Sequence, residues 1–198
     1  SQGAGILGDV VPGALALLPL AFRQRLQVTQ QCRPEDIDRV RASYAHHAIA
    51  ADLSTYIEDM PEKLGWAHLV IARAGASTIA ELTAAGRPAI LIPLPSATDD
   101  HQTHNVREMV AAGGARAIAQ ANFTAPELAK QMQKLALEPG ALENAAARAK
   151  SVGRPNATSD LADLVESTGG AGLMDVIQVG AGSSARSVRS STLGASAA

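Results

Sequence analysis

The chain has 198 residues, of which 46% are hydrophobic and 18% charged, a composition that suits one well-packed globular domain. A net charge of −2 and an aromatic content of 3% argue against nucleic acid as a partner, because neither a basic surface nor stacking platforms are available. The single Cys32 excludes an internal disulfide framework, and no apolar run reaches the roughly 18 residues that cross a bilayer, so we expect a cytoplasmic protein in which Cys32 is a small buried residue.

Apolar runs alternate with amphipathic segments, which predicts an α/β protein with βα units around a parallel sheet. The predicted strands, in chain order, are Leu26–Cys32, Ala48–Leu53, His68–Ala72, Ala89–Leu94 and Arg116–Ala119. The predicted helices are Ile6–Leu18, Pro34–Ala45, Met60–Trp66, Thr78–Ala85, Gln102–Ala112, Ala125–Ala136, Ala141–Ser151 and Ser159–Glu166.

Several helix boundaries carry a physical signal. Pro34 and Glu35 suit a first helical turn, where the missing proline N–H costs nothing and a carboxylate meets the positive end of the helix dipole. Thr124 and Glu127 form a predicted capping box, in which Thr124 accepts an N–H and Glu127 reaches back. One helix face that should pack on the sheet consists of Val106, Met109 and Val110.

The two ends of the chain differ from this pattern. Ser1–Gly5 is a turn that leads into a helix, and in an α/β protein such a turn follows an apolar strand. Gly169–Ala198 is rich in Gly, Ser and Ala, with one short apolar patch at Leu173–Val179. We expect this tail to be poorly ordered, because it buries too little apolar surface to offset chain entropy.

Small and polar residues follow two of the predicted strands. Arg73–Thr78 comes directly after one strand and opens a helix, and Asp99–Gln102 follows the next. Free N–H groups at a helix start, next to small residues, suit an anionic and hydroxylated ligand such as a nucleotide sugar. From this segment alone, Ser77 or Thr78 acting as a helix cap is the favoured interpretation.

Individual polar residues here have both a functional and an ordinary interpretation. Glu81, one turn into the helix, can accept two ribose hydroxyls or can be a solvated helix carboxylate. Gln102 can donate to and accept from sugar hydroxyls, while His101 either orients a substrate or is solvated. Asp99 and Asp100 have no third ligand nearby and are expected to be turn or cap residues, so no metal is assigned.

Taken together, these segments resemble one family. The segments that carry the resemblance are Ser1-Gln2-Gly3-Ala4, Arg73-Ala74-Gly75-Ala76-Ser77-Thr78-Ile79-Ala80-Glu81-Leu82, Gly86–Pro95, and Asp99–Gln102 with Asn105. The family is MurG of glycosyltransferase family 28, the UDP-N-acetylglucosamine:N-acetylmuramyl-(pentapeptide)-pyrophosphoryl-undecaprenol N-acetylglucosaminyltransferases of peptidoglycan synthesis. The resemblance covers roughly residues 1–167.

The resemblance implies a Rossmann-like parallel sheet with flanking helices, the C-terminal, donor-binding half of a GT-B fold. It further implies that Ser1 contacts the diphosphate, that Ile57 gives backbone contacts to uracil, and that Glu81 binds ribose hydroxyls. Gln102 and His101 would bind the GlcNAc hydroxyls. The residues that would wrap the nucleotide at the helix start are Ala76, Ser77, Thr78, Ile79 and Ala80. No cofactor is implied.

The resemblance also implies what lies elsewhere. The first strand of the domain would precede Ser1, and a separate N-terminal domain would carry the lipid I site, the general base and the surface that docks on the cytoplasmic face of the membrane. Residues 1–167 are therefore expected to bind UDP-GlcNAc, and residues 168–198 to be a disordered tail. The chain alone is expected to bind donor weakly and to turn over nothing.

Three alternatives remain open at this point. The first is another UDP-sugar transferase or a UDP-GlcNAc 2-epimerase, which would share the crevice. The second is a stand-alone donor-binding subunit that a separate membrane partner completes. The third is a generic Rossmann nucleotide binder, which a preference for NAD over UDP-GlcNAc would indicate.

Overall fold

A computed structural model describes residues 5–95, 101–157 and 159–167 of the chain. The chain divides into two compact units, Ser1–Arg154 and Pro155–Ala198. In the second unit, residues 159–167 are helical, in agreement with the helix expected there. Among the described residues, no helix is both long enough and apolar enough to cross a membrane.

The first unit alternates strands and helices, as the sequence pattern predicts. Its helices are α1 (Gly5–Ala16), α2 (Leu20–Arg23), α3 (Ile37–His46), α4 (Met60–Trp66), α5 (Ala76–Ala85), α6 (His101–Ala112), the 3-10 turn η2 (Gln120–Asn122), α7 (Ala125–Ala136) and α8 (Ala141–Ser151). Its strands are β1 (Val28–Gln31), β2 (Ala51–Ser54), β3 (Val70–Arg73), β4 (Ala89–Ile92) and β5 (Ala115–Ala117).

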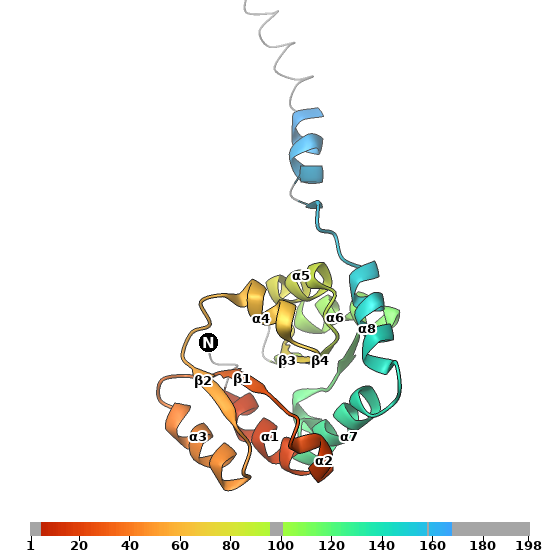
Figure 1. Ribbon diagram of the computed structural model, residues 1–198. Helices are drawn as coiled ribbons and strands as arrows, with labels where there is room; N and C mark the ends of the chain where they lie inside the picture. The colour runs from red at the N-terminus through yellow and green to blue at the C-terminus, as the bar shows by residue number, and fades with distance from the viewer. Residues whose placement is uncertain (1–4, 96–100, 158, 168–198) are drawn as a thin grey trace, which may run out of the picture. The chain divides into compact units, whose positions relative to one another are not determined.

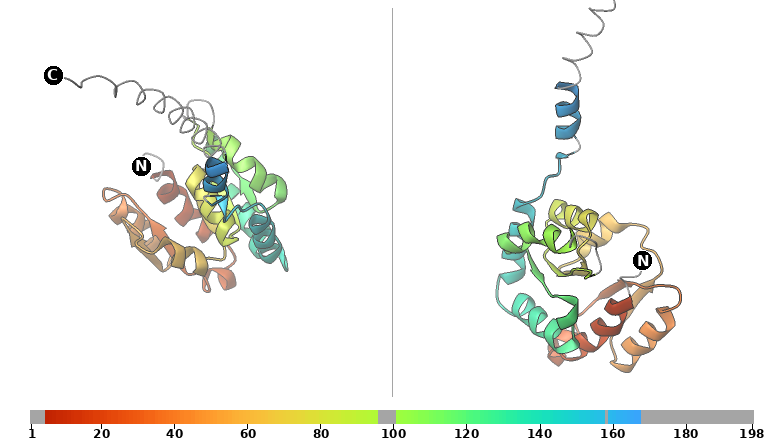
Figure 2. Two further views of the ribbon diagram at one scale, coloured as in Figure 1. Left: turned by 90° about the horizontal axis from the view of Figure 1, so that it is seen from above. Right: turned by 180° about the vertical axis from the view of Figure 1, so that it is seen from behind.

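All of the described strand pairs are parallel, but they form two separate sheets (Figures 1 and 2). β1 pairs with β2, with Val28 opposite Ala51, and β4 lies between β3 and β5, with Val70 opposite Ala89. Parallel strands need crossover connections, which the intervening helices supply. The α/β fold class with parallel sheets and flanking helices is therefore confirmed, and the division into two sheets is an addition to it.

β4 shows how the sheet separates two apolar layers. All four of its residues are buried, and they alternate between the two faces, as strand geometry requires. Ile90 and Ile92 pack into a cluster with residues of α1, α3 and α7. Ala89 and Leu91 pack into a second cluster with residues of α4, α5, α6 and α8.

Several helix boundaries differ from the sequence prediction. Pro34 and Glu35 lie in a turn before α3, which begins at Ile37. At α7, the Thr124 hydroxyl accepts from the Glu127 N–H at 3.4 Å, as expected. The Glu127 carboxylate does not reach back, because it accepts from the Gln131 side chain at 2.6 Å.

Two of the three residues predicted to form the buried face of α6 are buried. Val106 and Met109 are buried in the second cluster, whereas Val110 is 37% exposed. Val110 follows Met109 by one residue, a step of about 100° around the helix, which takes its side chain past the edge of the buried stripe. Cys32 is buried as expected, and desolvation raises the pKa of its thiol above the ordinary value.

Candidate functional site

The first turn of α5 begins directly after β3 and has no side-chain cap. Gly75 is the residue at the N-cap, and the first intrahelical bond runs from the Ile79 N–H to the Gly75 carbonyl at 3.0 Å. The expectation that Ser77 or Thr78 caps the helix is wrong, because both residues lie inside the first turn, beyond the cap position. The N–H groups of the first turn therefore have no intrahelical acceptor and can bind an anion.

Gln102, at the start of α6, joins the ends of β3 and β4. Its side-chain oxygen accepts from the Leu94 N–H at 3.0 Å and from the Ala74 N–H at 3.3 Å. Asn105, one turn further along α6, donates its amide to the Ala74 carbonyl at 3.2 Å. Both peptide groups of Ala74 are thus held by α6, which fixes the turn that leads into α5.

These hydrogen bonds limit the contacts that the Gln102 side chain can make with a ligand. An amide side chain has an acceptor oxygen and two N–H donors. In Gln102 the oxygen is already bound to two backbone groups, so the N–H donors are the part that can serve a ligand. The sequence analysis expected Gln102 both to donate to and to accept from a ligand, whereas in the structure its acceptor oxygen is used within the fold.

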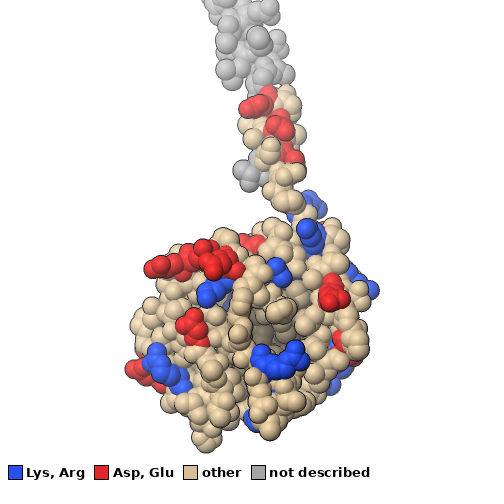
Figure 3. Space-filling model, viewed as in Figure 1, with Lys and Arg blue, Asp and Glu red and all other residues tan. Residues whose placement is uncertain are grey.

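Glu81 and Ile57 lie on different elements but line one cavity of about 1000 Å³. Thr78 and Arg73 line the same cavity, so the start of α5, the end of β3 and the segment between β2 and α4 face a common space. Glu81 is exposed and Ile57 is half-buried. Figure 3 shows this face of the molecule hollowed near its centre, with basic side chains beside the hollow.

The remaining predicted site residues do not all lie in this arrangement. Ile79 packs against the second apolar cluster and its N–H is bound to the Gly75 carbonyl, whereas Ala80 is exposed on α5. Ser1, Asp99 and Asp100 lie outside the described residues. His101 is the first residue of α6, and only its backbone position is described.

Arg73 also lines the cavity, and the sequence analysis assigned no role to it. Its guanidinium donates to the Ile92 carbonyl at 3.3 Å and to the Gln120 side-chain oxygen at 2.7 Å, which ties the end of β3 to β4 and η2. Partial burial lowers the pKa of this guanidinium below its usual value, but an arginine stays protonated at any physiological pH. The signal in the sequence is a cation placed directly at the end of an apolar strand.

Within the described ranges, no group of three His, Cys, Asp or Glu side chains is placed to hold a metal ion. Among the described charged residues that line the cavity are Arg25, Arg33, Arg73, Lys63 and the single carboxylate Glu81.

Residues 1–168 match the Glycosyltransferase family 28 C-terminal domain. The chain belongs to this family. The resemblance that the sequence motifs indicated is thereby confirmed, and the match covers the fold and the cavity described above.

Two relatives with similar sequences support the assignment of the chain to family 28. The chain is 66% identical to the UDP-N-acetylglucosamine--N-acetylmuramyl-(pentapeptide) pyrophosphoryl-undecaprenol N-acetylglucosamine transferase of Zymomonas mobilis over 86% of this chain and 44% of the relative. It is 64% identical to the protein of the same name from Erythrobacter litoralis, over 94% of this chain and 46% of the relative. The chain thus spans about half the length of these relatives.

A solved structure shows that the similarity to these relatives includes the fold. The crystal structure of Acinetobacter baumannii MurG superposes with a TM-score of 0.76 at 32% identity, over 83% of this chain and 49% of that chain. The family 28 domain therefore has the fold of one half of that protein, in agreement with the GT-B half that the resemblance implies.

Proposed function

We propose that the chain is the UDP-GlcNAc-binding half of a glycosyltransferase that transfers GlcNAc to lipid I and so forms lipid II. The observation that carries the proposal is the membership of glycosyltransferase family 28, with relatives more than 60% identical whose names state this transfer. The cavity supports it, because an uncapped helix start, an arginine and a carboxylate lie around one space.

Each proposed contact uses a group with suitable chemistry. The first-turn N–H groups of Ala76, Ser77 and Thr78 and the residue Ser1 receive the diphosphate, since a helix start attracts anions, and Ile79 and Ala80 complete the wrap around the nucleotide. Glu81 accepts the ribose hydroxyls, and the backbone at Ile57 pairs with uracil. Gln102, through its free N–H donors and together with His101, binds the GlcNAc hydroxyls.

The reaction breaks the bond between the anomeric carbon and the UDP oxygen and forms a bond from the C4 hydroxyl oxygen of the acceptor sugar to that carbon, with inversion. Negative charge develops on the leaving UDP, and we assign its stabilisation to the N–H groups at the start of α5 and to Arg73. The acceptor proton goes to a general base that we assign to the other half of the enzyme. That half also binds lipid I and docks on the cytoplasmic face of the membrane.

The ribose contact is tested by titrating the 198-residue chain with UDP-GlcNAc in a calorimeter. Glu81→Gln keeps the side-chain size and removes the charge, and a hydrogen bond to a charged group contributes about 1.5–3 kcal/mol. We expect affinity to fall by roughly 10- to 100-fold. The matched control is Glu108→Gln, an exposed carboxylate on α6 that does not line the cavity, which should change affinity less than about twofold.

The sugar contact is tested with Gln102→Glu. A glutamate keeps an oxygen for the Ala74 and Leu94 N–H groups but removes the N–H donors. We expect UDP-GlcNAc to bind more weakly while UDP, which lacks the sugar, loses much less. Equal losses for the two ligands would contradict a sugar contact, and tighter binding of NAD than of UDP-GlcNAc would contradict the proposed function as a whole.

A further inference from the structure

The segment between β2 and α4 reaches the cavity without secondary structure of its own. It runs from Thr55, which follows the end of β2, to Asp59, which precedes the start of α4. Ile57 lines the cavity and is half-buried, while Tyr56 is 71% exposed. Backbone that is neither strand nor helix takes its hydrogen bonds from side chains, water or a ligand.

The peptide groups of Ile57 are available to a ligand. In the part of the chain that the structure describes, neither the N–H nor the carbonyl of Ile57 has a hydrogen-bond partner. One residue thus offers one donor and one acceptor. Uracil presents an acceptor oxygen at C4 beside the N3–H donor, whereas cytosine presents a donor at C4 and an acceptor at N3. Ile57 distinguishes the two bases only if its peptide groups are held in one place.

The two ends of this segment are fixed by side chains. On the α4 side, Asp59 accepts from the Glu62 N–H at 2.9 Å and caps the helix. On the β2 side, the Gln31 side-chain amide donates to the Thr55 carbonyl at 3.0 Å, across 24 residues of sequence. The second contact lies only two residues before Ile57.

The contact from Gln31 begins where the pairing of the strands ends. Gln31 is the last residue of β1 and lies opposite Ser54, the last residue of β2. The Cys32 N–H bonds to the Ser54 carbonyl at 2.8 Å. Among the described residues, the bond from Gln31 is the single hydrogen bond that the backbone of residues 55–58 makes. The sheet therefore holds this segment through one side chain.

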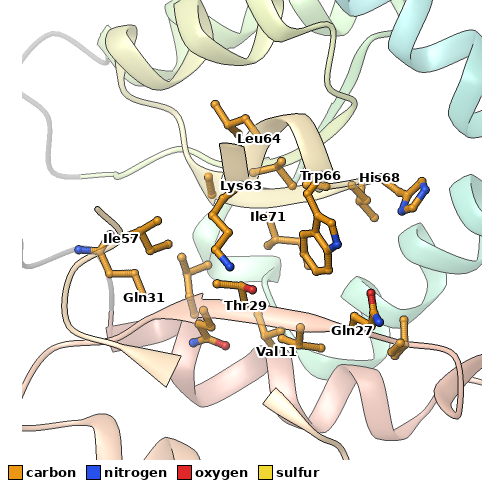
Figure 4. A pocket seen from close by; sticks show the side chains of 18 of the residues that line it. Val11, Gln27, Thr29, Gln31, Ile57, Lys63, Leu64, Trp66, His68 and Ile71 are labelled. Atoms are coloured by element: carbon orange, nitrogen blue, oxygen red, sulfur yellow. The ribbon is translucent and has the colours of Figure 1, made fainter. Parts of the chain in front are cut away.

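The position of Gln31 separates this contact from the core. Figure 4 shows Gln31 and Ile57 toward one end of the cavity and Gln27 toward the other. Gln31 is exposed, and so is its bond to Thr55. An exposed hydrogen bond adds little to the stability of a domain, because water replaces it when it breaks. Its larger effect is to restrict the backbone that leads to Ile57.

From these contacts we infer that Gln31 is a positioning residue for the nucleobase, which acts through Thr55 to hold Ile57 so that the domain selects uridine over cytidine nucleotides. The inference rests on the proposed function, in which the backbone at Ile57 pairs with uracil.

The first test needs no nucleotide. Gln31→Met keeps the length of the side chain and removes the amide donor. NMR relaxation of the 198-residue chain should show order parameters near 0.85, typical of rigid backbone, at Tyr56, Ile57 and Glu58 in the parent, and values below about 0.6 in Gln31→Met. The matched control is Gln27→Met, because Gln27 is also exposed, lines the same cavity and has no side-chain hydrogen bond to another described residue. It should leave all three amides rigid.

The second test compares UDP with CDP by calorimetry. The two ligands share the ribose and the diphosphate, so the ratio of their affinities reports the base alone. We expect the parent to prefer UDP by at least about 10-fold and Gln31→Met to lower this ratio by roughly 3- to 10-fold, the range of one ordinary hydrogen bond. Gln27→Met should change the ratio less than about twofold. Gln31→Lys, which restores a donor for the Thr55 carbonyl, should recover most of the selectivity.

The outcomes separate the inference from the proposed function. If UDP-GlcNAc binds the parent but Gln31→Met leaves the order parameters or the UDP-to-CDP ratio unchanged, the inference is wrong and the proposed function stands. Equal weakening of UDP and CDP together with a lower unfolding midpoint would assign Gln31 a structural role and would also overturn the inference. A parent chain that binds UDP no better than CDP would contradict the uracil contact itself, and the inference would fall with it.

Discussion

Ala74 is the residue on which the geometry of the proposed site depends. Its N–H and its carbonyl are both bound by side chains of α6, although Gln102 and Asn105 lie 28 and 31 residues later in the sequence. These two contacts fix the direction in which α5 starts. The side-chain amides of Gln102 and Asn105 thus hold the start of α5 in place through hydrogen bonds within the domain itself.

Burial of one thiol gives a prediction about pH. Desolvation raises the pKa of Cys32, so the folded state favours the neutral thiol. The stabilisation is complete below the pKa of the unfolded thiol, about 8.5, and is lost as pH rises through the folded value. Urea unfolding at pH 7.5, 8.5 and 9.5 should show stability falling with pH, and Cys32→Ala should flatten that fall.

The pH range of this experiment stays below the titration of the nearby tyrosine. Burial raises the pKa of Tyr44 as well, and its contribution begins only near pH 10, where an unfolded tyrosine ionises. If Cys32→Ala unfolds with the same pH dependence as the parent between pH 7.5 and 9.5, the thiol is not the group responsible.

At this scale the sequence singled out residues that the structure brings to one cavity, while their contacts with a ligand stay predictions. Glu81, Ile57 and Thr78 were all named, and they line one cavity. The double use of the Gln102 oxygen could not be predicted, because it depends on the positions of two backbone N–H groups from different strands. The capping role of Ser77 or Thr78 failed for a local reason, since α5 begins at Ala76, two residues before the predicted Thr78, and Gly75 takes the cap position.

At the scale of elements, the five strands and most helices follow from hydrophobic periodicity and boundary signals. Met60–Trp66, Ala125–Ala136 and Ala141–Ser151 have the predicted bounds, and Gly86 ends α5 in the left-handed conformation, with φ of 63°. The short α2 and η2 were not predicted, because segments of three or four residues carry no periodicity. The separation into two sheets depends on tertiary pairing, which one sequence does not contain.

Close packing around one glycine and open space around another predict opposite effects of two substitutions to alanine. A Cβ at Gly114 would lie 2.6 Å from the backbone N and Cα of Ala149, so Gly114→Ala should destabilise the domain by about 1–3 kcal/mol. At Gly65, inside α4, nothing lies within 4 Å of an added Cβ, and Gly65→Ala should stabilise by about 0.5–1 kcal/mol. Chemical denaturation measures both, and a Gly114→Ala chain as stable as its parent would contradict the close packing.

At the scale of the whole molecule, the chain spans 44–49% of the length of the relatives that it matches. Under the proposed function the groups around its cavity bind the donor, and the acceptor site and the base are assigned to the other half of the enzyme. Donor binding and sugar transfer should therefore separate in experiments on this chain.

The 198-residue chain, given UDP-GlcNAc with a labelled sugar and lipid I, should produce no lipid II while still binding the nucleotide. The measurement is label transferred to the lipid, with the Zymomonas mobilis relative under the same conditions as the positive control. Lipid II that increases with the amount of this chain would contradict the assignment of the base to another half.

Gly75 leaves the first turn of α5 without the hydrogen bond that a Ser or Asp at this position provides, a contact that contributes about 1 kcal/mol to helices elsewhere. The space for such a side chain exists, since a Cβ at Gly75 would meet the Thr78 hydroxyl at an ordinary 3.6 Å. A permanent cap would compete with any anion for the same N–H groups. Under the proposed function, this helix lacks the stabilisation of a cap until a ligand binds, so a Ser or Asp at position 75 would stabilise the helix and weaken UDP-GlcNAc binding.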